Sequence, residues 1–209
     1  MSGENLQTAF GGVTLADALF YRRSVRKFAA EPLHPDRLRA ALEAASLAPS
    51  PHGSAPWRFC IVATPEARLR LATEMGRDFL RDMEREGVPE EERRRRHAGS
   101  LRLITGAPAL ILAALSYKDL DRYEDPAKQA NERMMAEHSL GAALQNLMLA
   151  LAAQGIGSVW RCAPLFCPET ARKALSLPED WVPRAYVAAG RAAVPPPARP
   201  DARPGVLVR

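Results

Sequence analysis

A short run of cationic side chains near the N-terminus has the spacing of an anion-binding site. Residues 21–28 read YRRSVRKF, and Arg22, Ser24 and Arg26 occupy every second position of that run. In an extended segment alternate side chains point in the same direction, so these three can converge on one anion. The guanidinium of arginine donates to two phosphate oxygens at once, which favours a phosphate as that anion. Spacing alone leaves open that these arginines are solvated surface charges.

No catalytic group that acts by itself accompanies this run. The chain has no G-x-S-x-G nucleophile motif and no Walker loop, and its histidines lack the spacing of a metal site: His34, His52, His97 and His138. We therefore expect no catalytic side chain and no metal, but chemistry that belongs to a cofactor which the protein binds and orients. A rigid proline-rich loop, PSPHGSAP at residues 49–56, and an apolar core suit a planar, phosphorylated cofactor.

The composition is that of one globular domain rather than of a nucleic-acid-binding module or a membrane protein. The 209 residues are 47% hydrophobic and 25% charged, with a formal net charge of +5. A nucleic-acid binder would use the basic runs 22–27 and 93–96, but PEEE precedes the second and Phe28 follows the first, so neither is a continuous basic face. The longest apolar stretch, residues 140–153, contains two amides and is too short to cross a bilayer.

The three cysteines indicate thiols rather than disulfides. An odd count, with no apolar leader after the first methionine, predicts reduced cysteines in a cytoplasmic protein. Cys162 and Cys167 lack C-x-x-C spacing, so we expect them, with Cys60, to be bystanders of the fold.

Helical and strand patterns alternate irregularly along the chain. Helices are predicted at residues 14–23, 34–48, 64–86, 89–103, 125–154 and 167–177. Strands are predicted at residues 57–64, 108–117, 157–162 and 183–191, with a further strand-like end at 205–209. Because no glycine-rich strand-to-helix turn of the dinucleotide-binding type is present, the sequence predicts an α+β fold with a mixed sheet rather than a doubly wound one.

Two segments predict that the chain forms a homodimer. The long helix is apolar on nearly all sides after His138, and such a helix has to be buried all round, for which a subunit interface is a natural second cover. The proline-rich tail, residues 192–209, cannot form a helix and ends in GVLVR. We expect this tail to reach over another surface, with disorder as the alternative.

Three motifs resemble those of the FMN-dependent nitroreductase family. They are RRSVRKF at 22–28, LAPSPHGSAPWRFCIV at 47–62 and GIGSVW at 155–160. The family has R-x-S-x-R/K-x-F, A-P-S-x-x-N-x-Q-P-W and a glycine-containing turn before a strand, in the same order and spacing. The resemblance implies a mixed sheet flanked by helices, in a homodimer that exchanges C-terminal arms and binds two FMN molecules at the subunit interface.

The resemblance also assigns roles to residues of this chain. It implies that the first motif holds the FMN phosphate, with Arg23 packing or bonding near the ring: Arg22, Arg23, Ser24, Val25 and Arg26. The proline-rich loop is implied to lie along the isoalloxazine ring: Pro49, Ser50, Pro51, His52 and Ser54. Backbone N–H groups near the reactive ring edge are implied to come from Cys162 and Ala163, because Pro164 has none.

The C-terminal arm receives a role as well. In the family a basic residue of this arm returns to the phosphate, for which Arg199 is the first candidate and Arg203 the second. The implied division of the chain is an N-terminal extension (1–13), an FMN-binding domain (14–191) and an extended arm (192–209).

The proline-rich loop departs from the family pattern. Gly53 stands where the family has Asn, and Ala55 where it has Gln, so the polar contacts of those side chains cannot be made here. His52 remains as a candidate hydrogen-bond donor to the substrate, with a packed loop histidine as the alternative. These departures argue against carrying over a specificity for nitroaromatic compounds.

The chain is also similar to one branch of the family, the reductase domain that is fused to the glutamyl ligase of coenzyme F-420 biosynthesis. The ligase part is missing here, so the resemblance is to a stand-alone version of that reductase domain. The similarity lies in the proline-rich loop, in LSLPEDWVP at 175–183 and in Met75, Phe79, Asp82, Gly87 and Pro89. It implies a bulky, acidic acceptor, a dehydro precursor of a deazaflavin. We expect Asp82 to contact this substrate, unless it pairs with Arg81 or Arg85 on an exposed helix.

Residues 76–100 are expected to form a cover over that substrate, with soft points at Gly76, Gly87 and Gly99.

The electron donor is expected to be NAD(P)H or a reduced deazaflavin. A generic NAD(P)H-dependent nitroreductase or quinone reductase is an equal alternative, and a flavin-storing or flavin-sensing protein is the alternative that is not an enzyme. Benzimidazole synthases, which destroy a flavin, and iodotyrosine deiodinases share the first motif, but no other sequence feature points to either.

Overall fold

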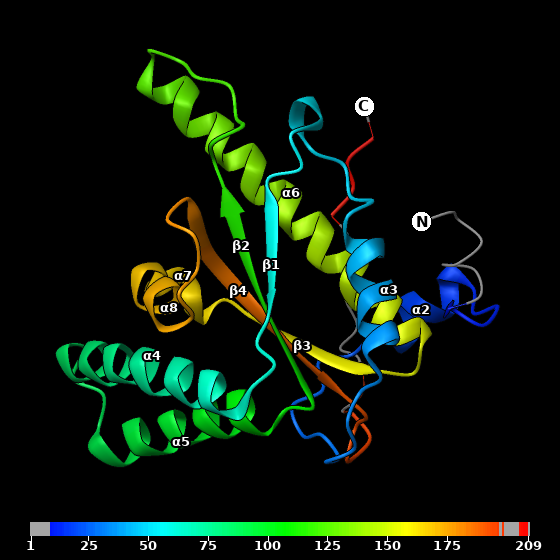
Figure 1. Ribbon diagram of the computed structural model, residues 1–209, viewed down its shortest axis with the longest axis vertical. Helices are drawn as coiled ribbons and strands as arrows, with labels where there is room; N and C mark the ends of the chain where they lie inside the picture. The colour runs from blue at the N-terminus through cyan, green and yellow to red at the C-terminus, as the bar shows by residue number, and fades with distance from the viewer. Residues whose placement is uncertain (1–8, 197, 199–204, 209) are drawn as a thin grey trace.

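Figure 1 shows the computed structural model, which describes residues 9–196, 198 and 205–208. Its helices are α2 (Leu15–Tyr21), α3 (Pro35–Ala45), the 3₁₀ turn η1 (Pro51–Gly53), α4 (Pro65–Arg85), α5 (Glu90–Gly106), α6 (Pro126–Ala153), α7 (Ala163–Phe166) and α8 (Pro168–Ala174). Its strands are β1 (Trp57–Ile61), β2 (Ala109–Ser116), β3 (Gly157–Arg161) and β4 (Trp181–Gly190). Every helix and strand predicted between residues 14 and 191 is present, which confirms the α+β fold; α7 and η1 were not expected.

The helices begin where the sequence offers a cap. Thr14 and Asp17 form a reciprocal capping box at α2, and the Thr64 hydroxyl accepts from the Ala67 N–H at the start of α4. Asp125 caps α6 in the same way, and a proline follows both Thr64 and Asp125 in the first turn. These side chains bond N–H groups that have no partner inside the helix, so they fix the first residue of each helix.

The four strands form one sheet in the order β1-β2-β4-β3, and every neighbouring pair is antiparallel. All eight residues of β2 are buried, as their unbroken apolar sequence ALILAALS predicts for a strand that is covered on both faces. Alternate residues of β2 enter different clusters. Ile111 and Leu115 pack with α3 and α6, whereas Leu110 and Leu112 pack with α4, α5 and α8.

The extended segment after α2 lies along the outer edge of β3. The Val25 N–H donates to the Ser158 carbonyl at 3.0 Å, and Ser24 forms an isolated parallel bridge with Ser158. The approach is close because Gly157 has no side chain: a Cβ at this position would lie 2.6 Å from Val25 Cγ2. This isolated bridge is parallel, whereas the four named strands of the sheet pair antiparallel throughout.

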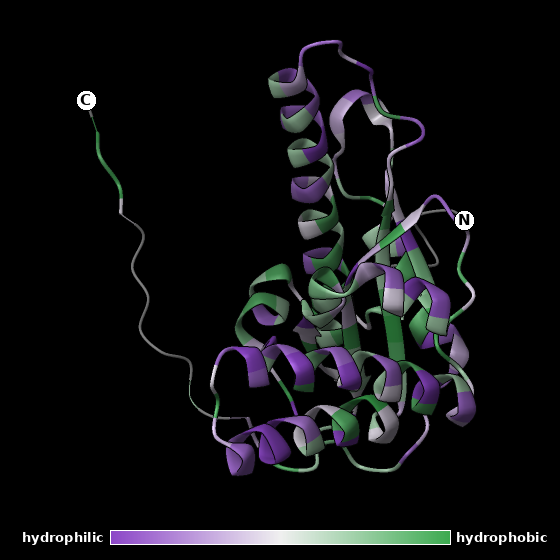
Figure 2. Ribbon diagram, turned by 90° about the vertical axis from the view of Figure 1, so that its left-hand side faces the viewer, coloured by the Kyte–Doolittle hydropathy of each residue, from purple (hydrophilic) through white to green (hydrophobic). Residues whose placement is uncertain are grey.

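Helix α6 is buried along one face and half-buried along the other. The buried residues are Glu132, Ala136, Ser139, Leu140, Ala143, Leu144, Leu147, Met148, Ala150 and Leu151. Gln145 and Asn146, on other sides of the helix, are half-buried, and Met134 in the projecting N-terminal half is 54% exposed (Figure 2). The expectation of burial all round is therefore wrong for a single chain, which covers only one side of α6. A second copy as the other cover stays a prediction.

The C-terminal tail differs from the sequence prediction. Residues 205–208 form no strand, and Val206, Leu207 and Val208 are 74–86% exposed. An extended apolar segment becomes a strand only where another strand pairs with its backbone, and none pairs with this segment in one chain. Arg199 and Arg203 lie outside the described residues. None of the helices in the described ranges is long and apolar enough to cross a membrane.

Candidate functional site

The predicted phosphate segment has the alternating geometry that its sequence indicates. Val25 is 6% exposed and packs against β3, whereas Ser24 and Arg26 on either side of it are exposed. The Arg26 guanidinium donates to the Ser24 carbonyl at 3.4 Å, so both residues lie on one side of the segment. Arg22 is the C-cap of α2, and its N–H donates to the Ala18 carbonyl. A hydroxyl and a guanidinium are thereby presented together at the start of β3.

The edge of β3 connects this segment to the predicted ring contacts. Ser158 lies beside Ser24, and four residues later Cys162 begins α7 as its exposed N-cap, followed by Ala163. At about 3.3 Å per residue, ~13 Å of strand edge separates the two ends. That length accommodates a phosphate at one end and a flavin ring at the other. One chain therefore brings residues 22–26 and Cys162–Ala163 to the same edge.

The proline-rich loop lies at the opposite edge of the sheet, directly before β1 (Figure 1). His52, Gly53 and Ala55 have φ angles of 53°, 67° and 43°, in the left-handed region. The Ala55 N–H donates to Ser50 Oγ at 3.0 Å, and Ser54 Oγ donates to the Pro51 carbonyl at 2.8 Å. These two hydrogen bonds hold the loop in a compact turn next to α6, in which Pro49 is exposed.

The predicted FMN site is consequently divided between two places in a single chain. Two strands separate β1 from β3, which is ~14 Å across the sheet at a strand spacing of about 4.8 Å. The loop and the phosphate segment also lie at opposite ends of the strands, because Trp57 pairs with Leu115 at the end of β2, whereas Ser158 lies level with the first residue of β2, Ala109. In a two-fold dimer, one surface patch of each chain meets the other patch of its partner, and the contact occurs twice. The division therefore supports the homodimer prediction, which no contact within one chain can test.

Two buried donors near the end of β3 lack acceptors within the described residues. They are the Trp160 Nε1 atom and the Tyr186 hydroxyl, and Tyr186 lies opposite Arg161 on β4. Buried polar atoms in folded proteins nearly always have a hydrogen-bond partner. Neither atom has accessible surface, and the Tyr186 hydroxyl lies close to the Ser100 and Arg161 side chains, so both belong to the interior behind the predicted ring contacts. No sequence pattern indicated Trp160 or Tyr186 as neighbours of the site, because the residue of β4 that lies beside the end of β3 depends on the register between the two strands.

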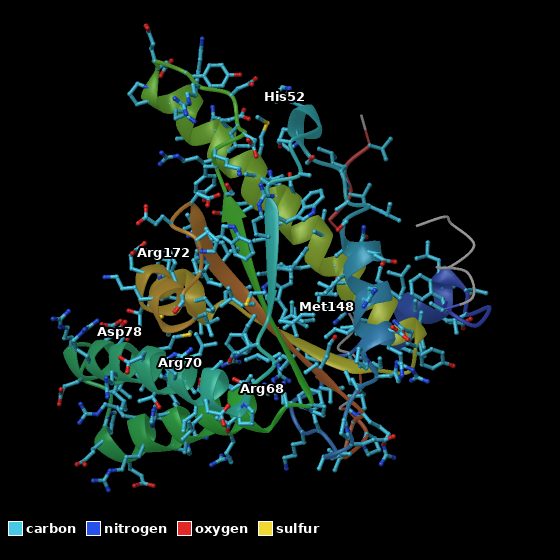
Figure 3. All side chains as sticks on the ribbon, in the orientation of Figure 1. His52, Arg68, Arg70, Asp78, Met148 and Arg172 are labelled. Carbon is cyan, nitrogen blue, oxygen red and sulfur yellow. The ribbon has the colours of Figure 1, made fainter. Side chains whose placement is uncertain are left out.

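The predicted substrate residues lie far apart. His52 stands at one end of the molecule, with its Nε2 atom 3.7 Å from Asp121 Oδ2, and α4 lies at the other end, where Figure 3 labels Asp78. Asp82, one turn after Asp78, pairs with Arg81 at 3.6 Å, which is the alternative that the sequence left open. In one chain His52 and Asp82 cannot contact the same ligand, so a shared substrate would require two chains.

The expected cover, residues 76–100, forms two packed helices. Gly76 is buried in α4, where a Cβ would lie 2.5 Å from His97 Nε2 of α5, so it is a close helix contact and not a soft point. Gly87, with φ 72°, makes the turn between the helices. The basic run 93–96 is a solvated helical face, as expected, because its arginines pair with glutamates of α4 and α5.

Two of the three cysteines are half-buried thiols whose pKa is raised. Burial raises the pKa of the Cys167 thiol to about 11, and the nearby Asp78 and Asp82 carboxylates add to the effect. A thiol with that pKa remains protonated near neutral pH and is a poor nucleophile. Burial also raises the pKa of Cys60, whereas Cys162 is exposed. All three are free, as predicted.

The fold and the site define an α+β domain with an anion-binding segment along one sheet edge. The chain belongs to the nitroreductase family, whose family model matches residues 19–191. A BluB-like flavoprotein from Clostridium difficile has the same fold, with a TM-score of 0.76 at 22% identity over 95% of this chain and 100% of that chain. A structure from Desulfovibrio desulfuricans in complex with FMN has a TM-score of 0.69 at 24% identity, over 92% of each chain.

One curated relative changes an expectation about the branch. The 5,6-dimethylbenzimidazole synthase of Rhodospirillum rubrum is 30% identical over 175 residues, which cover 83% of this chain and 80% of that protein. The view that nothing beyond the first motif points to the benzimidazole synthases is therefore wrong. The comparisons confirm the predicted family and agree with FMN as its cofactor, but they do not confirm the F-420-linked branch.

Proposed function

We propose that this protein is an FMN-dependent oxidoreductase that passes two electrons from a reduced donor to a conjugated acceptor. The observation that carries the proposal is the docking of residues 22–28 along β3. It presents Ser24 and Arg26 at one end of a strand edge and the exposed turn at Cys162 at the other end. Bound FMN supplies the two-electron chemistry, and the residues of the chain bind and orient it.

Each part of the chain has a separate task in this proposal. Arg22, Ser24 and Arg26 bind the phosphate, and Arg23 lies near the ring. The N–H groups of Cys162 and Ala163 face the reactive ring edge, where no side chain need act as a nucleophile. The loop of a second copy, residues 49–54, covers the ring and completes the site. The C-terminal arm, residues 192–209, crosses to the second copy and brings Arg199 or Arg203 to the phosphate.

The donor and acceptor are proposed from the sequence resemblance alone. NAD(P)H or a reduced deazaflavin serves as donor. The acceptor is a dehydro deazaflavin precursor in the F-420-linked interpretation, and a quinone or nitro compound in the generic one. Gly53 and Ala55 remove two polar side chains from the loop, which favours recognition of the acceptor by stacking rather than by hydrogen bonds from this loop.

A second candidate function is the conversion of the flavin itself to a benzimidazole. It is favoured by the 30% identity to the Rhodospirillum rubrum 5,6-dimethylbenzimidazole synthase over most of both chains. In this case reduced FMN is the substrate rather than a resident cofactor.

One set of experiments separates these functions. Purified protein is titrated with FMN, and the bound flavin is then reduced under anaerobic conditions with NADH, NADPH or a reduced deazaflavin. Reoxidation by a deazaflavin precursor, a quinone or a nitroaromatic compound identifies the acceptor class. Admission of air to the reduced protein, followed by chromatography for 5,6-dimethylbenzimidazole, tests the second function. A protein that binds no FMN at micromolar concentration contradicts both.

A further inference from the structure

The end of β3 carries a cation to which neither the sequence nor the family resemblance assigns a role. Arg161 is the last residue of the strand, directly before Cys162, and it is exposed. It pairs in register with Tyr186 of β4, which is 0% exposed. The Tyr186 hydroxyl has no accessible surface, and its polar neighbours are the side chains of Ser100 and Arg161.

Arg161 and Tyr186 project from the same face of the sheet. Residues directly opposite each other on antiparallel strands point to the same side, and Val159 and Tyr186 both pack in the cluster under α4 and α5. Arg161 lies two residues after Val159, so its side chain starts from that face. Burial raises the pKa of Tyr186, and the Arg161 charge together with hydrogen bonds from the Ser100 and Arg161 side chains lowers it, so the guanidinium lies close to the hydroxyl.

Arg161 is too far from the phosphate segment to serve the phosphate. Three residues separate Ser158, beside Ser24, from Arg161, which corresponds to ~10 Å of strand edge. Arg22 and Arg26 already supply cations at the phosphate end. The cation at Arg161 therefore stands where the ring of the proposed cofactor would lie, beside the Cys162 turn.

We infer that Arg161 is a charge-compensating residue at the ring end of the site, where it favours the reduced form of FMN over the oxidised form and sets the reduction potential. The inference rests on the proposed FMN site. Two electrons and one proton enter the ring on reduction, so the neutral ring gains one negative charge. A guanidinium that is always protonated stabilises this charge, and it faces no comparable charge in the oxidised state. Tyr186 is fully buried and acts through Arg161, whose guanidinium it positions from inside the fold.

The test is the midpoint potential of bound FMN, measured by stepwise reduction with dithionite against a reference dye. Arg161→Met removes the charge but keeps the length of the side chain. It should weaken the binding of reduced FMN relative to oxidised FMN about tenfold, which lowers the potential of a two-electron couple by ~30 mV. Arg161→Lys should restore most of the potential. Tyr186→Phe should shift it in the same direction by a smaller amount.

Arg95→Met is the matched control, because Arg95 is an exposed arginine of α5 that pairs with Glu92. It should leave the potential unchanged. An unchanged potential in Arg161→Met, with FMN still bound, overturns the inference. Equal weakening of oxidised and reduced FMN also overturns it, since that result describes a structural residue. Unmutated protein that binds no FMN contradicts the proposed function instead, and the initial FMN titration detects this case.

Discussion

The two edges of the sheet are built in different ways. At the β3 edge, residues 22–28 are hydrogen-bonded to the strand, and Val25 fills the space that Gly157 leaves open. At the β1 edge, the proline-rich loop has three left-handed residues, and an exposed contact of 3.7 Å joins His52 Nε2 to Asp121 Oδ2 in the loop before α6. Such a pair contributes at most about 1 kcal/mol.

This difference indicates which half of the site a single chain can complete. At the β3 edge the backbone of residues 22–28 is held by the strand, so the proposed binding groups, Ser24 and Arg26, start from a fixed backbone before any ligand arrives. The loop stores local strain, which costs of order 1–3 kcal/mol for each left-handed residue other than glycine and is found most often at functional sites. Hydrogen bonds between residues of the loop itself fix the loop conformation. The outer surface of the loop remains available for contact with a ligand or a second copy. Four changes test this comparison.

The largest expected effect comes from Gly157→Val. The new Cβ would lie 2.6 Å from Val25 Cγ2, so residues 22–28 have to move away from β3. Loss of two charge-assisted hydrogen bonds costs roughly 3–6 kcal/mol, which weakens FMN binding by about two to four decades. Fluorescence titration with FMN measures this change. Gly99→Ala, where nothing lies within 4 Å of the new Cβ, should bind FMN normally. Normal affinity in Gly157→Val would contradict the placement of the phosphate site.

Arg26→Ala should weaken FMN binding by about one to two decades, because a hydrogen bond to a charged group contributes roughly 1.5–3 kcal/mol. Arg22→Ala should have a similar effect, and Ser24→Ala a smaller one. The matched control is Lys27→Ala, which removes a neighbouring exposed cation that does not belong to the alternating set. If Lys27→Ala weakens FMN as much as Arg26→Ala, the segment attracts anions by net charge and has no phosphate site.

Removal of the C-terminal arm should loosen the dimer and the flavin together. Intact protein is expected to sediment at twice 22.9 kDa. Two truncations separate the role of the arm from that of its first residues, because the Ala193 N–H donates to the Lys27 carbonyl and so supports the phosphate segment. Deletion of 195–209 spares this contact, whereas deletion of 192–209 removes it. If both truncated chains remain dimers with normal FMN affinity, the arm has neither of the proposed roles.

The smallest effect is expected at the proline-rich loop. Ala55 has a φ of 43°, a conformation that glycine adopts without strain. Relief of this strain, partly offset by the greater conformational entropy that glycine loses on folding, should stabilise the apo protein by about 1 kcal/mol and raise Tm by about 2–4 °C in a chain of this size. Ala44→Gly in α3 should lower Tm instead, because glycine weakens a helix interior. A lower Tm in Ala55→Gly would show that the loop is not strained.

Local chemistry made most of the elements predictable. Thr64 and Asp125, each followed by proline, marked helix starts that the structure has at the next residue. The alternation in YRRSVRKF agrees with the exposed Ser24 and Arg26 on either side of the buried Val25, whereas Arg22 ends α2 as its C-cap. These predictions depend on neighbours within a few residues, which is the information that a single sequence contains.

Long-range pairing decided the rest. The order β1-β2-β4-β3 places the loop and the phosphate segment at opposite edges, and nothing in the sequence fixes that order. The pairing of Arg161 with Tyr186 depends on register across 25 residues of chain, so neither was a candidate. Gly76 gave the signal of a flexible point, but its role is set by His97 on another helix.

The contact of residues 22–28 with β3 also protects the chain from aggregation. An open strand edge is a template for strands of other molecules. At the β3 edge, the Val25 N–H donates a hydrogen bond to the Ser158 carbonyl. At the β1 edge, the Arg58 guanidinium donates hydrogen bonds to the Ala55 and Trp57 carbonyls. Substitutions that detach the phosphate segment would expose the β3 edge, so loss of the cofactor and loss of solubility should occur in the same variants.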